Sequence, residues 1–403
     1  MVMGKKGKSG FARFLICIVY AVYSLYYIED METSANVVVK QTESRGSVHL
    51  FLIVLIGMLA LYMLLRTTFT GRLKISSLNA PLILLAVWGV FSDFLNGASF
   101  WSIAVHIGLI VLWVLVIFFM EDIVIDKRTY NLVILFEFVI WIITIYYSGV
   151  ALTNFSNYSA EIGQGDISNV LNISYNVLVL IPFLLQIKYK LIRNISLLIS
   201  CGLIILSMKR GALLAMGLML VIYYYMQVKS GKMKISLFKV TSILALFVIG
   251  VIVVNKITNN ALLSRFTWES LSTGSNRNIL YSAAINDILD RNFVEFLIGK
   301  GSGSSLATIG SGVHNEILEM LFSYGLIGLI IYLWLIIRGL KLIFKLLKEK
   351  SNASAIYAMS VVYIIFVGLV GTALFAHYSF HIMASIGISA GYLRREAENY
   401  ELR

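Results

Sequence analysis

The stretch ASFWSIAVHIGLIVLWVLVIFF, residues 98–119, decides the fold class because it contains no Asp, Glu, Lys or Arg. A helix that crosses a membrane needs about 20 predominantly apolar residues. The whole chain of 403 residues is 59% hydrophobic and 13% charged, and its mean hydropathy is +0.85. Ordinary soluble chains are about 45–50% apolar and about 25% charged. The composition therefore predicts an all-α polytopic membrane protein and excludes soluble enzymes and secreted disulfide modules.

Apolar runs on both sides of 98–119 bring the prediction to about twelve transmembrane helices in a single membrane domain, 1–403. Cys17 and Cys201 both lie inside such runs, so they indicate no disulfide framework. The predicted spans are 11–28, 47–65, 77–95, 98–119, 130–149, 172–187, 194–208, 211–226, 236–254, 315–337, 354–376 and 377–393.

The basic residues give the orientation, because cytoplasmic loops of membrane proteins are enriched in Lys and Arg. The N-terminal run begins after a basic segment without a clean signal-peptide cleavage site, which indicates a retained helix with a cytoplasmic N-terminus. With both termini inside, 24 of the 33 Lys and Arg residues fall on the cytoplasmic side. The net charge of +12 is then mostly a topology signal, and no nucleic-acid partner is needed to explain it. The nine on the outer side are Lys40, Arg45, Lys209, Arg210, Lys256, Arg265, Arg277, Arg291 and Lys300.

The longest predicted outer loop, 255–314, lies before the last three spans. Its apolar periodicity predicts a short helix over 276–290, with Ser275 as its N-cap, lying on the outer membrane surface. The glycine-rich stretch 299–303 should end any helix.

Cations on the outer side are the first candidates for a binding site. Arg210 begins a span directly after Lys209, so its guanidinium group either snorkels to the interface or binds an anion. Arg277 opens the expected surface helix, where a phosphate would meet both an arginine and a helix N-terminus. Arg265, Arg291 and Lys300 are more ordinary loop charges.

His314 lies at the junction of the long loop and the tenth span. One interpretation is a capping cluster, in which Asn315 caps the helix and Glu316 and Glu319 occupy its first turn. The other is a histidine base at the outer membrane edge. His-x-Glu is weak evidence for a metal site, and no third ligand has convincing spacing.

Two ionisable residues lie in the middle of predicted spans, His106 in the fourth and Glu137 in the fifth. Such residues indicate function by default. If these spans are antiparallel neighbours, the two side chains lie at similar depth, so we expect a structural Glu–His pair, with a proton relay as the alternative. His377, Tyr378 and His381 are expected to line an outer cavity.

Together, several motifs in one order make the chain resemble the bacterial O-antigen polymerase and ligase family. SMKRGA at 207–212 is similar to the family's Ser-x-x-Arg-Gly step, and NRNILYSAA at 276–284 with GKGSG at 299–303 is similar to its Arg…Ala…Gly-x-Gly loop. VHNEIL at 313–318 and YGLIG at 324–328 are similar to its His-Asn…Gly-Leu-Ile-Gly signature. The resemblance covers about 200–337, and Lys209 stands where the family often has serine.

The resemblance implies a metal-independent glycosyltransferase of type C in the bacterial cytoplasmic membrane, without a cofactor. It would transfer glycan from a polyprenyl-pyrophosphate-linked oligosaccharide donor to an acceptor sugar, among membrane lipids and with a chain-length regulator and a flippase as further partners. Arg210 and Arg277 would bind the pyrophosphate and His314 would act on the acceptor hydroxyl. Further substrate contacts are expected from Lys209, Arg265, Arg291, Lys300, Glu316 and Tyr378.

The motifs do not separate a polymerase from a ligase. A polymerase is preferred, because that role occurs in bacteria with and without an outer membrane. A lipid-linked glycan flippase or secondary transporter is the competing class, since twelve spans suit it equally well. Transporters usually show two similar halves, whereas only the second half here has a long outer loop. A sensor or scaffold is a third class, but we find no soluble signalling domain in the sequence.

Overall fold

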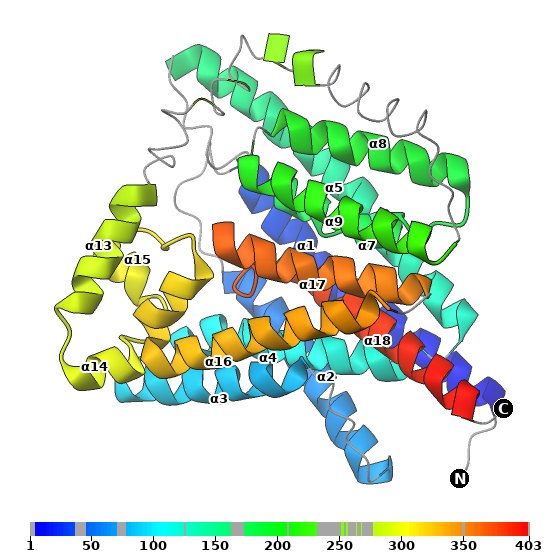
Figure 1. The fold of residues 1–403 in the computed structure, drawn as a ribbon, viewed down its shortest axis with the longest axis horizontal. Helices are drawn as coiled ribbons and strands as arrows, with labels where there is room; N and C mark the ends of the chain where they lie inside the picture. The colour runs from blue at the N-terminus through cyan, green and yellow to red at the C-terminus, as the bar shows by residue number, and fades with distance from the viewer. Residues whose placement is uncertain are drawn as a thin grey trace. The chain divides into compact units, whose positions relative to one another are not determined.

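Helices make up all the regular structure of the computed structural model, in agreement with the predicted all-α class (Figure 1). The structure describes residues 5–36, 46–70, 78–124, 126–162, 173–207, 209–231, 251–253, 255–256, 263, 267, 277–348 and 351–401, and there is no strand among them. The helices labelled in order are α1 (Lys5–Asn36), α2 (Gly46–Thr70), α3 (Asn79–Leu95), α4 (Phe100–Ile123), α5 (Lys127–Ile162), α6 (Ile173–Leu178), α7 (Ile181–Leu184), α8 (Lys190–Leu206), α9 (Arg210–Lys229), α13 (Arg277–Leu289), α14 (Phe293–Ile298), α15 (Ser304–Ile309), α16 (Glu316–Leu346), α17 (Asn352–Val370) and α18 (Ser379–Glu401).

Seven of these helices are long and apolar enough to cross a membrane, so the chain is a membrane protein. The predicted count of twelve is not reached within the described residues, and most of the predicted span 236–254 lies outside them. Helix α3, in the predicted span 77–95, is not one of the seven, because its 17 residues rise only about 25 Å at 1.5 Å per residue. The seven are Gly10–Glu32, Leu50–Thr68, Phe100–Ile123, Lys127–Thr153, Arg210–Lys229, Glu316–Leu346 and Asn352–Val370.

The predicted sixth span, 172–187, is two short helices rather than one continuous helix. Helix α6 ends at Leu178, and α7 begins at Ile181 with Pro182 in its first turn. Proline has no backbone N–H and its ring clashes with the preceding turn, so it disfavours the interior of a helix but is accepted in the first turn. Pro182 therefore explains the break.

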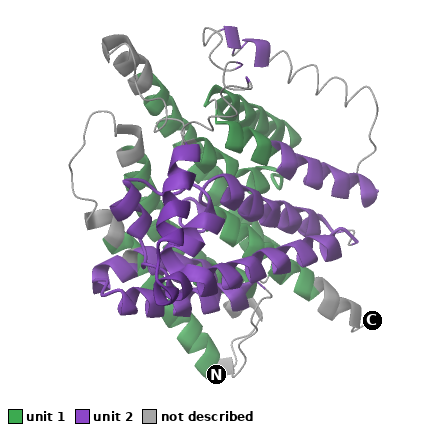
Figure 2. Ribbon diagram, turned by 60° about the vertical axis from the view of Figure 1, so that its left-hand side comes forward, with its two compact units in different colours: residues 1–72, 115–216, 380–403 green, residues 73–114, 217–379 purple. Residues whose placement is uncertain are grey.

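The chain forms two compact units, which Figure 2 colours separately. The first comprises 1–72, 115–216 and 380–403, and in it α1 packs against α2 and α5. The second comprises 73–114 and 217–379. In this second unit, α16 packs against α3 and α17, and the short helices α13, α14 and α15 gather at α16 (Figure 1).

Helix α16 is broken at Gly325, whose backbone has φ 66° and ψ −168°. A side chain at this position would meet a backbone wall, because an added Cβ would lie 2.3 Å from the carbonyl oxygen of Leu297. We call residues 316–324 the first arm of α16 and residues 326–346 the second arm.

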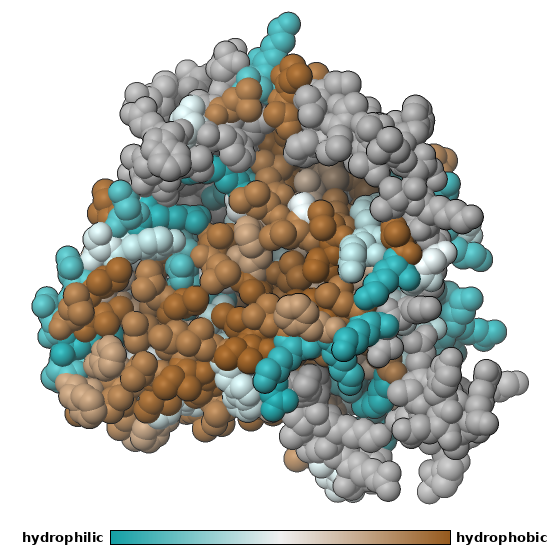
Figure 3. All heavy atoms as spheres, viewed as in Figure 1, coloured by the Kyte–Doolittle hydropathy of each residue, from teal (hydrophilic) through white to brown (hydrophobic). Residues whose placement is uncertain are grey.

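The exposed side chains of α3, and of the second arm as far as Ile337, are apolar (Figure 3), and beyond Ile337 the second arm also exposes Arg338, Lys341 and Lys345. On α3 the side chains of Val87, Phe91 and Phe94 are exposed, and on the second arm those of Ile337 and Phe344. An exposed surface of this kind suits contact with lipid rather than water.

Candidate functional site where α13 and α16 meet the end of α17

Asn315 caps the first arm of α16, as the sequence predicts. Its side-chain oxygen accepts hydrogen bonds from the backbone N–H groups of Ile317, at 3.0 Å, and Leu318, at 3.2 Å. The residue before it, His314, is exposed and has φ 56°. Left-handed backbone is uncommon outside glycine, although histidine adopts it more often than most residues. A fixed turn thus presents the imidazole at the start of the helix.

Arg277 and Asn315 converge on the last turn of α17. The guanidinium Nη1 of Arg277 donates to the carbonyl oxygen of Val370 at 2.6 Å, and Asn315 Nδ2 donates to that of Leu369 at 3.1 Å. The last carbonyls of a helix have no partner within the helix, so side chains at this end satisfy them. The structure thereby brings Arg277 and His314, both expected in catalysis, to one helix end.

The other N–H groups of Arg277 have no hydrogen-bond partner within the part of the chain that the structure describes. An arginine carries five N–H donors in a planar fork, and the side chain is only partly buried. Arg277 can therefore bind the carbonyl oxygen of Val370 and an anion at the same time.

Glu316 is buried directly beneath this site. Its Oε2 accepts from the hydroxyl of Tyr332 at 2.8 Å, and its Oε1 accepts from the backbone N–H groups of Ala373, at 2.5 Å, and Leu374. Both carboxylate oxygens are thus occupied by the protein. These contacts favour a structural role over the substrate contact expected for Glu316, and they fix the loop 371–378.

Tyr378 lies in that loop, and its hydroxyl donates to the carbonyl oxygen of Thr372 at 3.4 Å. A second anchor is Trp113, whose indole Nε1 donates to the carbonyl oxygen of Leu374 at 2.6 Å. The loop next to His314 is therefore held from two sides, by α16 and by α4. Tyr378 is partly exposed and remains a predicted substrate contact.

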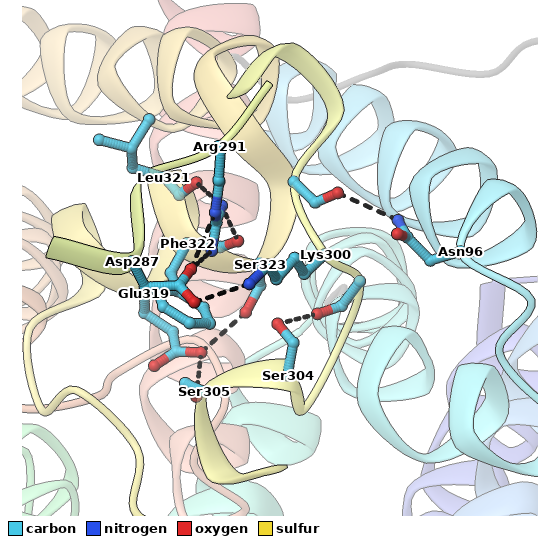
Figure 4. Close-up of polar contacts among 12 residues, drawn as sticks. Asn96, Asp287, Arg291, Lys300, Ser304, Ser305, Glu319, Leu321, Phe322 and Ser323 are labelled. Carbon is cyan, nitrogen blue, oxygen red and sulfur yellow. Dashed lines mark hydrogen bonds and ion pairs between the residues drawn. The ribbon is translucent and has the colours of Figure 1, made fainter. Parts of the chain in front are cut away.

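A second cluster ties α13 to the glycine-rich stretch, and Figure 4 shows Arg291 and Lys300 both directed at Asp287. The ion-pair distances are 2.7 Å from Arg291 Nη2 and 2.6 Å from Lys300 Nζ. Burial tends to raise the pKa of Asp287, but hydrogen bonds from Lys300 and Arg291 outweigh it, and the net pKa is lowered. The side chain of Arg291 is 1% exposed and also donates to the carbonyl oxygen of Phe322 at 2.7 Å, which favours a structural role over substrate binding.

Glu319 gathers further contacts on the same side of the first arm (Figure 4). It accepts from the hydroxyls of Ser305, at 2.8 Å, and Ser323, at 2.9 Å, and from the backbone N–H of Val313 at 3.1 Å. The carboxylate therefore fixes the turn that carries His314.

Sequence reasoning missed Asp93, which is fully buried near the end of α3. It accepts from the backbone N–H of Ser302, at 2.5 Å, and from the Ser302 hydroxyl, at 2.7 Å. An ionisable residue inside a predicted span was the available signal, since Asp93 lies within the run 77–95.

The predicted pairing of Glu137 with His106 is wrong. Glu137 Oε2 lies 2.7 Å from Nδ1 of His381, and its Oε1 accepts from the Tyr20 hydroxyl at 2.6 Å. The ring Nδ1 of His106 instead faces the carbonyl oxygen of Ser102, within its own helix, at 2.9 Å. His381 is fully buried in this pair and does not line an outer cavity.

Arg210 begins α9 at the position expected for a span start, and Lys209 precedes it. Both belong to the first unit, whereas Arg277 and His314 belong to the second. Arg265 and the expected N-cap Ser275 lie outside the described residues. Joint phosphate binding by Arg210 and Arg277 stays a prediction.

No group of three His, Cys, Asp or Glu residues that could hold a metal ion occurs in the described part of the chain. No protein-family model matches the chain, and no curated protein matches it. Function is therefore inferred from the residues themselves.

Proposed function

We propose that this protein is a glycosyltransferase of the bacterial cytoplasmic membrane that polymerises polyprenyl-pyrophosphate-linked oligosaccharide units into a surface polysaccharide. The observation that carries the proposal is the convergence of Arg277 and Asn315, next to the exposed His314, on the last turn of α17. An anion-binding group beside a base suits a reaction in which a phosphate leaves and a hydroxyl attacks.

In the proposed reaction, the acceptor hydroxyl oxygen forms a bond to the anomeric carbon of the donor sugar. The bond between that carbon and the pyrophosphate oxygen breaks, and the electron pair stays on the polyprenyl pyrophosphate. The hydroxyl proton moves to the imidazole of His314. The guanidinium group of Arg277 balances the developing negative charge, and Arg210 with Lys209 provides a second set of phosphate contacts. Cations in these positions would make a metal unnecessary.

Three alternatives share features with this proposal. A ligase would use the same donor and transfer the glycan to a lipid or protein acceptor. A flippase or secondary transporter would move lipid-linked units without making a glycosidic bond. The site at His314 favours transfer, because transport needs no base beside an anion-binding arginine.

Deleting the gene and separating the surface glycans on a gel tests the proposal directly. Single repeat units on their acceptor are expected for a polymerase. Full-length polymer that stays on the polyprenyl lipid would indicate a ligase, and lipid-linked units trapped inside the cell would indicate a flippase. Purified protein should also polymerise lipid-linked units in EDTA. Activity that stops in EDTA and returns with Mg²⁺ would contradict the metal-free scheme.

A further inference from the structure

The two arms of α16 do not lie in line. Glu316 Oε2 and the Tyr332 hydroxyl are 2.8 Å apart, although the two residues are sixteen positions apart in one helix. In a straight helix they would be separated by about 24 Å, which is beyond the reach of the two side chains. The first arm must therefore turn back sharply at Gly325 and lie beside the second arm.

The backbone groups released at this turn have partners in neighbouring segments. The carbonyl oxygen of Phe322 accepts from Arg291 at 2.7 Å, and that of Ser323 accepts from the backbone N–H of Gly301 at 2.8 Å. The carbonyl oxygen of Tyr324 accepts from Trp88 Nε1 at 2.9 Å. A helix can break within a membrane protein when such partners exist, so neighbouring segments stabilise this turn.

A glycine on α17 fits the same arrangement. A Cβ added to Gly368 would lie 2.5 Å from the Tyr332 hydroxyl and 2.6 Å from Glu316 Oε2. The absence of a side chain there lets α17 close over the contact between the two arms.

The second arm leads from the turn to the cytoplasmic side of the membrane. Its uncharged residues 326–337 rise about 18 Å before Arg338, the first of the cations on the predicted cytoplasmic side, so the start of the arm lies inside a hydrocarbon core about 30 Å thick. Tyr332 lies six residues inside this arm, which is about 9 Å below its start. Because Glu316 meets Tyr332, the start of the first arm, with His314 beside it, lies at about that depth.

We infer that the first arm of α16 is re-entrant and that His314 lies in a water-accessible recess within the membrane, about 9 Å below the start of the second arm. His314 is exposed, so the part of its ring that does not contact protein faces either lipid or water at this depth. Water is the favoured surrounding, since polar groups within a membrane line aqueous cavities or protein rather than lipid. The inference concerns the place of His314 and does not depend on the proposed reaction.

Distances between nitroxide spin labels test the turn. With Cys17 and Cys201 replaced by Ser, labels would be attached at His314→Cys and Ile337→Cys, both on exposed side chains, in protein reconstituted into liposomes. The folded-back arm predicts about 15–20 Å, whereas a straight helix predicts about 35 Å. The control pair Ile330→Cys and Phe344→Cys, exposed positions within the second arm, should give about 21 Å in either case.

The same label at position 314 tests the recess. Its relaxation should respond more strongly to water-soluble nickel–EDDA than to oxygen, which concentrates in lipid. A distance near 35 Å overturns the re-entrant arm, and a label that responds mainly to oxygen overturns the recess. If His314→Cys does not fold, Ile317→Cys paired with Ile337→Cys repeats the distance measurement, with about 30 Å expected for a straight helix. The label measurements do not depend on the activity of Arg277 variants, so the re-entrant arm and the proposed function can each fail without the other.

Discussion

The Glu316 carboxylate accepts a hydrogen bond from the hydroxyl of Tyr332, sixteen residues further along the same helix. The same carboxylate accepts from two successive backbone N–H groups of the loop after α17. One buried side chain therefore joins the two arms of α16 to the loop that carries Tyr378.

Removing the Tyr332 hydroxyl should destabilise the protein, because one buried carboxylate oxygen then loses its partner. Tyr332→Phe is expected to cost about 1–3 kcal/mol, seen as a lower midpoint of thermal unfolding in detergent micelles. Tyr146→Phe is the matched control, since Tyr146 is 66% exposed. Equal midpoints for the two variants would contradict the assigned role of the junction.

Gly368→Ala should weaken the same junction by steric overlap. The new methyl group would lie within 2.6 Å of both Glu316 Oε2 and the Tyr332 hydroxyl, so one of them must move. Gly202→Ala serves as the control, because nothing lies within 4 Å of the added Cβ on α8. The control is expected to be neutral or stabilising by about 0.5–1 kcal/mol. A Gly368→Ala variant as stable as the control would show that α17 does not close on this contact.

Gly325→Ala should be more damaging than Gly310→Ala, although both glycines have positive φ. Nothing lies within 4 Å of an added Cβ at Gly310, whereas at Gly325 it meets the Leu297 carbonyl oxygen at 2.3 Å. At Gly310 (φ 79°, ψ 1°), alanine meets only the cost of left-handed backbone, about 1–2 kcal/mol. Gly325 (φ 66°, ψ −168°) has a backbone conformation that essentially only glycine adopts, so the difference between the variants combines this added backbone strain with the overlap. The measurements are the folded yield and the unfolding midpoint of each variant. Similar losses of stability in the two variants would argue against a tight turn at Gly325.

His314→Ala should lower the rate of polymerisation by about 10²–10⁴-fold, the usual contribution of a general base, while donor binding persists. The positive φ of His314 complicates the alanine variant, because alanine tolerates that backbone poorly. His314→Asn separates the two effects, since asparagine adopts left-handed backbone readily and has no basic ring. Both variants should be slow. Wild-type turnover of His314→Asn would show that the imidazole is not the base.

Arg277→Ala should abolish polymerisation, and Arg277→Lys should restore it only partly, because a lysine lacks the planar fork that can hold Val370 and a phosphate together. Arg338→Ala is the control, as this exposed arginine on α16 only lies over the Trp334 ring in the described structure. Polymer yield with purified lipid-linked units is the measurement. An active Arg277→Ala variant would exclude this residue from pyrophosphate binding.

Asp287→Asn should loosen the link between α13 and the stretch 299–303, with a defined pH dependence. Because the pKa of Asp287 is lowered in the folded protein, its stabilisation is complete above the ordinary aspartate pKa, about 3.9, and is lost as pH falls through the lower folded value. The difference in unfolding midpoint between wild type and variant should thus stay constant from pH 5 to pH 8 and shrink below about pH 4. A difference that changes near neutral pH would point to another group.

Local signals in the sequence were enough for α13, for the helix stop after it and for the cap of α16. The apolar spacing over 276–290 matches α13, in which Ala284 and Ile288 are buried, and Asn315 caps α16 as expected. The helix stop at 299–303 also holds, because Gly299, Gly301 and Gly303 all have positive φ. Each of these features depends on residues a few positions apart.

Long-range partners were not accessible from the sequence alone. Glu137 pairs with His381, 244 residues away, whereas the prediction relied on consecutive spans. The turn at Gly325 depends on the carbonyl oxygen of Leu297, and a mid-span glycine by itself predicts no such reversal. Hydropathy counted the residues after position 315 as part of a crossing helix, although the first arm only lies beside it.

The re-entrant arm also has a consequence for biogenesis. During synthesis, the insertion machinery meets 316–346 as one long hydrophobic segment, before α17 or the loop after it has emerged. Glu316 then lacks the backbone N–H groups of Ala373 and Leu374, and a carboxylate without partners is costly in lipid. The carboxylate gains these partners only once residue 374 has been synthesised, so the junction between the two arms and the loop can be completed only after 316–346 has left the ribosome.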